Sequence, residues 1–475
     1  MGKLQFYNKI SRNFLFKFIG TFLIFCFQFI IANFLGAENY GEFTLFISYA
    51  AVCQIFCLVG LDQYLIKIIP VLDKKKSKDQ FILSFFIFIF FYLLCACIIF
   101  FLFPLKYKFY FFLYLFLKSI SLLIDGYLQG YFLADKVFFI NDTLGNLLKV
   151  ALILISNLFF NLKIEHIILI VIVTEFFLLF CKTSCKEIFC FKHSGFKIER
   201  KNIVKTISYS FSFFLISGFV IILNNIDKIM IEKTLSFYYV GIYKIVQNYS
   251  YVINIFISPF VIFWPMISNY YNKSQFYQIE SKLIEIREIV IFSAIPLYIF
   301  FLFNYNFLIN LFDQSIDCSN LFLLFFFMAT AVLFDAISGP VGAILTMTNY
   351  SKHYLLNNVL TLIINIILNF IFVRWWGVDG IALGTLISVI FNNLISCFQI
   401  NKLLKIKVFH IKLIIIIFIV TIANSLIVVF LNKILNNCNL NILLMLFVKI
   451  IILYGSNFII FIKKYKKLVS LMKGV

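Results

Sequence analysis

The chain has 475 residues, of which 63% are hydrophobic and only 13% are charged. Its mean hydropathy of +1.01 is typical of membrane proteins, because no soluble core buries so much apolar surface. The formal charge of +20 at pH 7 would suggest a nucleic-acid partner in a soluble protein, but here the basic residues are dispersed between apolar runs. The composition therefore predicts an all-α integral membrane protein and excludes a nucleic-acid-binding function.

Apolar runs bounded by polar residues, glycine or proline predict about fourteen transmembrane helices, since each crossing needs roughly 20 apolar residues. In chain order these predicted helices span 14–35, 42–62, 81–103, 109–133, 138–160, 165–182, 204–228, 237–263, 289–308, 320–347, 354–373, 379–400, 411–431 and 441–462. The first follows a short basic segment and lacks a small-residue cleavage site, so we expect a retained helix rather than a signal peptide.

Lysine and arginine are distributed unevenly between the alternate loops of this arrangement. With a cytoplasmic N-terminus, about three quarters of them fall on the inner side of the membrane. The largest inner cluster begins at the end of the sixth predicted helix with Lys182, which is assigned to the loop that follows, and it includes Lys192, Arg200 and Lys201. This bias is typical of cytoplasmic loops, and it predicts a multi-pass protein with both termini in the cytoplasm.

The two halves of the sequence match each other at corresponding places. Leu35 and Gly41 in FLGAENYGEF match Leu235 and Gly241 in TLSFYYVGIY, two hundred residues later. A parallel repeat of this kind predicts two lobes of about six helices that enter the bilayer in the same direction. The expected divisions are an N-terminal lobe at 1–182, a basic cytoplasmic linker at 183–203, a C-terminal lobe at 204–400, and two terminal helices with a basic tail at 401–475.

Ionisable residues inside the predicted helices indicate a polar path through the membrane. Each Lys or Asp at the centre of a helix costs about 2.5 to 3.5 kcal/mol on insertion, so such residues need water or a partner. The candidate substrate-binding residues are the lysines Lys118, Lys149 and Lys244. The candidates for binding a proton or cation that drives the return step are the acids Asp125, Asp227 and Asp335.

Pairing within one lobe is the alternative role for each of these charges. Lys118 and Asp125 lie seven residues apart, so they share one face of their helix. Opposite charges at similar depths in the two lobes also allow a pair between Lys118 and Asp335. Glu175 and Lys449 are expected to form pairs or to reach the interface rather than to bind substrate.

Several stretches resemble one known family. They are LGAENYGEF after the first helix, GLDQYLIKIIP after the second, and NNIDKIMIEKTLSFYYVGIYKIV across the seventh and eighth. Together they resemble the bacterial polysaccharide-unit flippases, which export O-antigen and capsule units and belong to the multidrug/oligosaccharidyl-lipid/polysaccharide exporter superfamily. The stretch NVLTLIINIILNFIFVRWWGVDGIALGTLIS looks like helices 11 and 12 of that family, with Gly377 and Gly380 at the connecting turn.

The resemblance implies a V-shaped pair of six-helix lobes around a hydrophilic cavity in the bacterial inner membrane. Its implied cargo is an undecaprenyl-pyrophosphate-linked oligosaccharide, moved from the cytoplasmic to the periplasmic leaflet by alternating access for O-antigen and lipopolysaccharide synthesis. The two terminal helices would shelter the lipid tail. Membrane lipid, a polysaccharide polymerase and chain-length machinery are the implied partners, and no catalytic residue is implied because flipping breaks no covalent bond.

Two other functions are consistent with part of the pattern. A multidrug or cation antiporter of the same superfamily would share the lobes but have an acidic pocket, whereas lysines and acids are equally frequent inside these helices. A membrane glycan polymerase would carry catalytic residues on a long outer loop, and the longest outer loop here has Asp313 and Asp317 but no basic residue. No phosphate-binding loop is present, and the spacing of Cys181, Cys185, Cys190 and His193 fits no common zinc pattern, so we expect neither a cofactor nor a metal.

Overall fold

The computed structural model describes residues 3–102, 107–131, 133–159, 161–184, 200–257, 260, 263–313, 316–318, 320–408, 410–435 and 444–457. These residues form helices joined by short irregular segments, and no strand occurs among them. The expected all-α membrane fold is confirmed. The predicted basic linker lies mostly outside the described residues, as do Cys185, Cys190 and His193.

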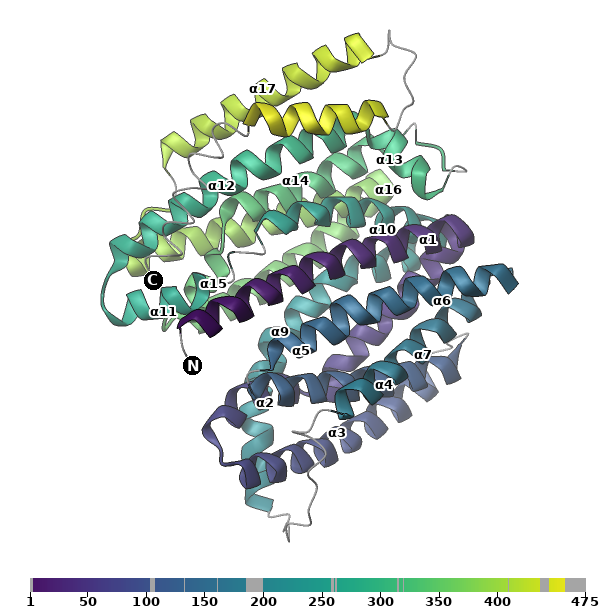
Figure 1. Ribbon diagram of the computed structural model, residues 1–475, viewed down its shortest axis with the longest axis vertical. Helices are drawn as coiled ribbons and strands as arrows, with labels where there is room; N and C mark the ends of the chain where they lie inside the picture. Colours follow the sequence, from purple (N-terminus) through teal and green to yellow (C-terminus); the bar gives the residue numbers. More distant parts are fainter. Residues whose placement is uncertain are drawn as a thin grey trace. The chain divides into compact units, whose positions relative to one another are not determined.

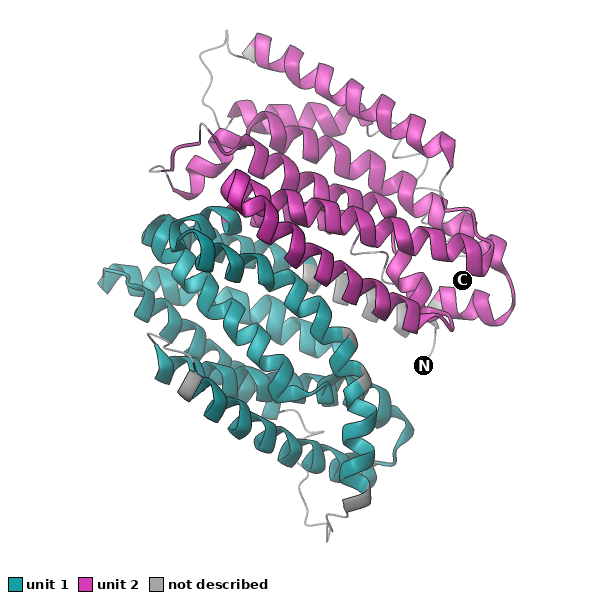
Figure 2. Ribbon diagram, turned by 180° about the vertical axis from the view of Figure 1, so that it is seen from behind, with its two compact units in different colours: residues 1–244 teal, residues 245–475 magenta. Residues whose placement is uncertain are grey.

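Packing divides the chain into two compact units, residues 1–244 and 245–475 (Figure 2). The helices of the first unit are α1 (Lys3–Leu58), α2 (Leu61–Ile68), η1 (Ile69–Val71), α3 (Lys74–Leu102), α4 (Lys108–Gly130), α5 (Ala134–Phe138), the π-helical η2 (Phe139–Gly145), α6 (Asn146–Phe159), α7 (Ile164–Thr183) and α9 (Arg200–Thr234). Helix α10 (Phe237–Val252) contains the boundary between the units.

The second unit continues with another set of long and short helices. They are η3 (Ile253–Phe256), α11 (Phe263–Asn272), α12 (Phe276–Phe303), α13 (Tyr305–Phe312), α14 (Phe322–Ser338), α15 (Val341–Met347), α16 (Ser351–Leu404), α17 (Ile411–Leu435) and a last helix at Leu444–Asn457. Helix α14 packs between α12 and α16, and these three run side by side (Figure 1).

Every predicted transmembrane helix has a helical counterpart in the described residues. Eight helices are long and apolar enough to cross a bilayer, or ten if two bent pairs are each counted as one span. Two of the eight, α1 and α16, are each long enough for two crossings, because their apolar segments run for 41 and 54 residues. The short α10 and the helix at Leu444–Asn457 account for the remaining predictions.

Glycine marks the break inside both of the long helices. Gly36 in α1 has φ 71° and ψ 167°, and Gly377 in α16 has φ 55° and ψ −130°. Both conformations are accessible to glycine because it has no Cβ atom. The chain therefore turns back at the points where the apolar pattern predicted a connection, and Gly377 is confirmed as part of the turn between the eleventh and twelfth helices.

The predicted repeat has a structural counterpart around Gly41 and Gly241. A Cβ atom on Gly41 would collide with the carbonyl oxygen of Phe237, and one on Gly241 would collide with that of Ala37. In each case the obstructing carbonyl belongs to the residue four positions before the other glycine. The two matched stretches thus cross at equivalent positions, with their backbones in direct contact, as small residues allow in membrane helices.

The structure adds features that hydropathy did not predict. The predicted helix at 320–347 is two helices, α14 and α15, bent by 46° at Gly339 and Pro340, where proline cannot donate a backbone hydrogen bond. Helix α12 begins at Phe276 rather than near residue 289, and short helices such as α2 and α11 connect the spans. Helix α9 packs on α1 and α2 within the first unit, and the predicted lobe limits stay a prediction.

Candidate functional site

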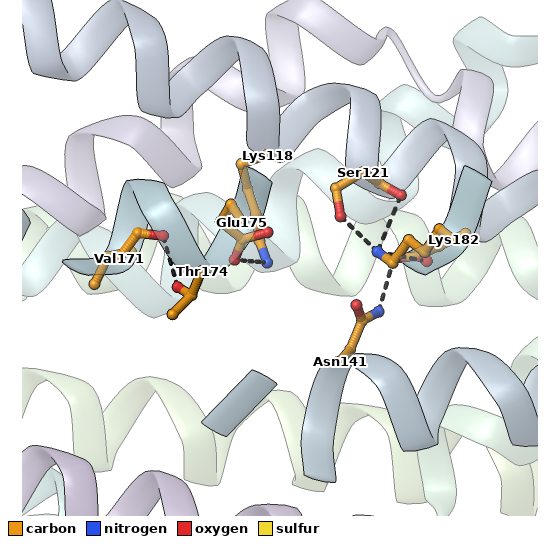
Figure 3. Close-up of polar contacts among 8 residues, drawn as sticks. Lys118, Ser121, Asn141, Val171, Thr174, Glu175 and Lys182 are labelled. Atoms are coloured by element: carbon orange, nitrogen blue, oxygen red, sulfur yellow. Dashed lines mark hydrogen bonds and ion pairs between the residues drawn. The ribbon is translucent and has the colours of Figure 1, made fainter. Parts of the chain in front are cut away.

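Two ion pairs join α4 to α7 in the first unit. Lys118 Nζ lies 2.8 Å from Glu175 Oε1, and Lys182 Nζ lies 2.8 Å from Asp125 Oδ1. Figure 3 shows Lys118 facing Glu175, and Lys182 facing Ser121 at the other level of the same helix pair. We refer to these four charged residues as the charge ladder.

The geometry of the charge ladder follows from the spacing of its residues. Lys118 and Asp125 are seven residues apart on α4, and Glu175 and Lys182 are seven apart on α7, so each helix presents its two charges on one face. Because the earlier residues pair with each other and so do the later ones, α4 and α7 run parallel. The order of charge is inverted, since α4 carries the base first and α7 carries the acid first.

The charges face protein while apolar side chains on the same helix face outward. The side chains of Glu175 and Lys182 are 1% and 0% exposed, whereas Phe176 and Phe180 on α7 are each 66% exposed. An ionised group in this position is tolerated only when it is paired or hydrated. The charge ladder therefore supplies the partners that these residues need inside an apolar bundle.

Two neutral residues, Asn141 and Ser121, form hydrogen bonds with the ion pair of Asp125 and Lys182. Asn141 Nδ2 donates to Asp125 Oδ2 at 2.8 Å, and Lys182 also donates to the hydroxyl and the carbonyl oxygen of Ser121. Asn141 comes from the π-helical η2, a wider turn of the kind often found at functional sites. Residues of three elements, α4, η2 and α7, thus contact one another around this ion pair.

The ion pair of Lys118 and Glu175 has fewer additional hydrogen bonds. Lys118 is 28% exposed at its side chain, and Glu175 Oε2 is buried without a hydrogen-bond donor among the described residues. Lys149 lies on α6, which packs against α7, and it forms no ion pair within the part of the chain that the structure describes. Its Nζ lies 6.0 Å from the ring centroid of Phe27 on α1.

A second polar group joins α9 to α10. The Tyr243 hydroxyl donates to Asp227 Oδ2 at 2.6 Å, and Lys228 donates to Asn225 at 2.9 Å. Asp227 is 5% exposed, while Lys244 is half-buried. Asp227 on α9 and Lys244 on α10 therefore lie on two consecutive helices, and neither belongs to the charge ladder of α4 and α7.

The remaining predicted acid, Asp335, lies on α14 in the second unit. Its side chain is exposed, and its Oδ1 accepts a hydrogen bond from Asn393 Nδ2 on α16 at 2.9 Å. Lys449, which was expected to pair or reach the interface, donates to Asn304 at 3.1 Å. Asp335 thus accepts a hydrogen bond from a neutral amide, whereas Asp125 forms an ion pair with a lysine.

The structure brings together residues that the sequence had treated separately. Glu175 was expected to form a pair, and it pairs with Lys118. Lys182 was assigned to the loop after the sixth helix and was missed, although it is fully buried against Asp125. The equal spacing of seven residues in both helices, with the charges in opposite order, is the signal in the sequence that would have identified it.

No group of three or more His, Cys, Asp or Glu side chains suited to a metal ion occurs among the described residues. The polar contacts of the site are ion pairs and hydrogen bonds made by side chains, one of them to a backbone carbonyl. This chemistry can orient an ionic or hydroxyl-rich ligand inside the membrane, and none of these contacts is by itself a catalytic arrangement.

The fold is similar to those of solved membrane transporters. A lipid II flippase, MurJ, in an inward closed conformation matches with a TM-score of 0.68 and 16% identity, over 98% of this chain and 100% of that chain. A multidrug resistance MATE family transporter in an inward-facing conformation matches with a TM-score of 0.61 and 15% identity, over 81% of this chain and 95% of that chain. A MOP superfamily transporter from Pyrococcus furiosus matches at 0.54 and 14%, over 84% and 95% of the two chains.

Comparison with curated proteins gives no significant match. A family model described as polysaccharide biosynthesis protein matches residues 7–271, which is more than half of the chain. The match agrees with the resemblance found in the sequence motifs. This multi-pass membrane protein therefore belongs to the polysaccharide biosynthesis protein family.

Proposed function

We propose that the protein is a flippase that moves undecaprenyl-pyrophosphate-linked oligosaccharide units from the cytoplasmic to the periplasmic leaflet. The observation that carries the proposal is that several lysines lie half-buried among the helices of the first unit. The chain belongs to the polysaccharide biosynthesis protein family and has a fold similar to that of solved transporters. A pyrophosphate linked to a lipid carrier is an anion that must cross the bilayer, and buried ammonium groups are its natural partners.

The candidate contacts with the pyrophosphate are Lys118, Lys149 and Lys244. All three are half-buried among the helices of the first unit, where an ammonium group attracts an anion more strongly than it does in bulk water. Lys118 already has Glu175 as its counter-charge, which weakens its attraction for another anion. We therefore expect Lys118 to attract an anionic cargo less strongly than a lysine without a paired carboxylate does.

Return of the empty carrier site needs an energy source, and we propose that an acidic residue binds the coupling ion. Asp125 is occupied by Lys182, and Asp227 accepts a hydrogen bond from Tyr243. Asp335 is exposed and accepts a hydrogen bond from a neutral amide, so a proton or cation can reach it without breaking an ion pair. Asp335 is thus the best of the three candidates for coupling.

The proposed setting is the bacterial inner membrane, with both termini in the cytoplasm, as the distribution of Lys and Arg predicts. The product would be surface polysaccharide such as the O-antigen of lipopolysaccharide. A polymerase and chain-length machinery would then act on the flipped units, and flipping itself needs neither a catalytic residue nor a cofactor.

The second candidate is a multidrug or cation antiporter, which the similarity to MATE transporters favours. The two functions differ in the sign of the cargo, since an antiporter for cationic drugs needs an acidic site. Asp125 and Glu175 are each paired with a lysine, so neither of these two acids offers an uncompensated charge to a cation. A glycan polymerase is a weaker alternative because flipping accounts for the site without bond-making groups.

Deletion of the gene in its host tests the proposal directly. Lipid-linked glycan is measured on each face of the inner membrane, and we expect units to accumulate on the cytoplasmic face and surface polysaccharide to be lost. Normal exposure on the periplasmic face would contradict the flippase function. Increased sensitivity to cationic drugs without any change in lipid-linked glycan would favour the antiporter.

A further inference from the structure

The connection between α16 and α17, residues 404–410, has no regular secondary structure after Leu404, yet its first residues alternate between two sides. Leu404, Ile406 and Val408 are 4%, 0% and 2% exposed, whereas Lys405 and Lys407 between them are exposed. Residues 401–412 include no acid and four exposed lysines, which are Lys402, Lys405, Lys407 and Lys412. One side of the connection is therefore apolar and packed, and the other is basic and exposed.

Glu280 on α12 holds the backbone of the connection. Its Oε2 accepts a hydrogen bond from the backbone N–H of Lys407 at 3.1 Å. The ring of His410 contacts the same carboxylate, because its Nε2 lies 3.4 Å from Glu280 Oε1 and 3.0 Å from the carbonyl oxygen of Lys407. Glu280 is thus engaged with the backbone and with His410, and none of the four exposed lysines forms an ion pair among the described residues.

Arg287, two turns further along α12, holds the next residue of the connection. Its Nη1 donates to the carbonyl oxygen of Val408, and its Nε and Nη2 donate to that of Ser338 at 2.9 and 2.6 Å. The Arg287 side chain is buried, and Ser338 is the last residue of α14. The connection is therefore fixed to α12 at two successive residues, and one guanidinium group also links it to the end of α14.

The exposed lysines stand directly before the lipid-facing surface of α17. This helix is long and apolar enough to cross a bilayer, and its first turns expose Ile411, Ile414 and Ile415 by 77%, 56% and 52%. Isoleucines exposed on a membrane helix contact the hydrocarbon of the lipids. The lysines that precede them therefore lie at the depth of the lipid headgroups, on the side that the distribution of Lys and Arg predicts to be cytoplasmic.

We propose that the four exposed lysines of residues 401–412 bind the headgroups of anionic phospholipids, and that Glu280 and Arg287 are positioning residues that hold the connection in its binding conformation. The orientation rule for inner loops accounts for the number of lysines, but it requires neither the alternation nor a backbone fixed by buried and charged side chains. Each lysine near a membrane surface strengthens binding to anionic lipid about fivefold. The site does not depend on the cargo, so it is compatible with a flippase and with an antiporter.

The apolar surface beside the lysines favours a phospholipid over a free phosphate. Ile411 and Ile414 extend the basic surface into one that acyl chains contact, whereas inorganic phosphate gains nothing from apolar residues. A phospholipid held there contacts α17 and, through the connection, is linked to α12, on which α17 packs. Its binding should therefore stabilise the packing of α17 on α12 and raise the unfolding temperature.

Binding of phosphatidylglycerol to the purified full-length protein in a neutral detergent, measured by native mass spectrometry, tests the assignment. We expect the wild type to retain phosphatidylglycerol in preference to phosphatidylcholine, and the double change Lys405→Gln with Lys407→Gln to weaken this binding by about tenfold or more. The matched control is Lys75→Gln with Lys76→Gln, which removes two exposed lysines at the start of α3, on the same predicted side of the membrane. It should leave the binding nearly unchanged.

The two double variants remove the same charge, so their comparison separates a site from a general attraction. Equal losses in both, or a wild type without preference for phosphatidylglycerol, would overturn the proposal. Phosphatidylglycerol should also raise the unfolding temperature of the wild type and of the α3 control, and raise it less in the variant of the connection. An equal rise in all three proteins would contradict the proposed site.

Glu280 tests whether the conformation of the connection matters. Glu280→Ala removes a negative charge, so charge alone predicts tighter binding, whereas loss of the hydrogen bond to the backbone of Lys407 predicts weaker binding. We expect weaker binding by Glu280→Ala, and binding as in the wild type by Glu280→Gln, whose amide oxygen still accepts this hydrogen bond. Tighter or unchanged binding by Glu280→Ala would overturn its positioning role. Where that variant is unstable, the lysine variants still decide whether the connection binds lipid.

Competition identifies the source of the phosphate group. We expect neither inorganic phosphate nor undecaprenyl pyrophosphate to displace phosphatidylglycerol from the wild type as readily as further phosphatidylglycerol does. Displacement by inorganic phosphate to the same extent would show that the lysines bind phosphate without a lipid. If undecaprenyl pyrophosphate competes in the wild type and does not bind the variant of the connection, then the lysines hold the cargo, and the assignment to phospholipid is overturned.

Discussion

The two units hold their intramembrane polar groups in different ways. In the first unit, α4 and α7 are joined by the two ion pairs of the charge ladder. In the second unit, the two halves of α16 are joined by neutral groups, as in the mutual hydrogen bonds of Asn357 and Gln399 at 2.8 and 2.9 Å. The contact between α4 and α7 thus relies on opposite charges, and the contact between the two halves of α16 relies on amides that both donate and accept.

The difference teaches how each unit fixes the register of its helices. If α4 slid by seven residues along α7, either Asp125 would meet Glu175 or Lys118 would meet Lys182, and both are like-charge contacts. The inverted order of charges therefore disfavours the register displaced by seven residues. An amide is less selective, since Asn or Gln can pair with another amide or hydroxyl in either direction.

The largest expected effect comes from removing one partner of the most buried pair. Lys182→Leu leaves Asp125 inside the bundle with Asn141 as its remaining partner, and an uncompensated buried charge costs about 3 to 5 kcal/mol. We expect a marked fall in the unfolding temperature of the purified protein. The double change Asp125→Asn with Lys182→Gln keeps the shape without the charges, and it should restore most of the stability; a double variant as unstable as the single one would contradict this reading of the pair.

A smaller effect is expected when the ion pair of Lys118 and Glu175 is reversed rather than broken. Lys118→Glu with Glu175→Lys preserves an ion pair, but it places both acids on α4 and both bases on α7. The register displaced by seven residues then also brings opposite charges together. We expect near-normal stability, with cysteine pairs introduced for both registers reporting cross-links in each; cross-links in the original register alone would show that the order of charges does not determine it.

The sequence was sufficient for the spans and for part of the site. Hydropathy located each crossing, and glycine located the turn at Gly377, because both signals are local. The early start of α12 and the short connecting helices could not be predicted from hydropathy, since they depend on amphipathic packing against neighbours. Residues such as Glu280 and Glu285 made the start of α12 look like a loop.

The pairing of charges was predicted only in part, for a related reason. The spacing of Lys118 and Asp125 established that they share a face, but it did not show which helix lies opposite. Lys182 looked like a loop cation because it stands at the end of an apolar run, and its burial depends on the packing of α7 against α4. Packing between helices distant in sequence is the information that a single sequence did not provide.

The smallest expected effect concerns the neutral contacts of α16. Asn357 donates to Ser396 Oγ and Gln399 Oε1 and accepts from Gln399, and its side chain is fully buried. Hydrogen bonds between membrane helices contribute about 0.6 kcal/mol on average and up to about 1.7, so Asn357→Leu should lower the unfolding temperature far less than Lys182→Leu. Gln399→Leu is the matched change on the other half of α16. A loss of stability as large as that of Lys182→Leu would mean that amides stabilise the packing of these helices as much as ion pairs do. The two units would then differ in the ligands they can bind and not in the stability of their helix packing.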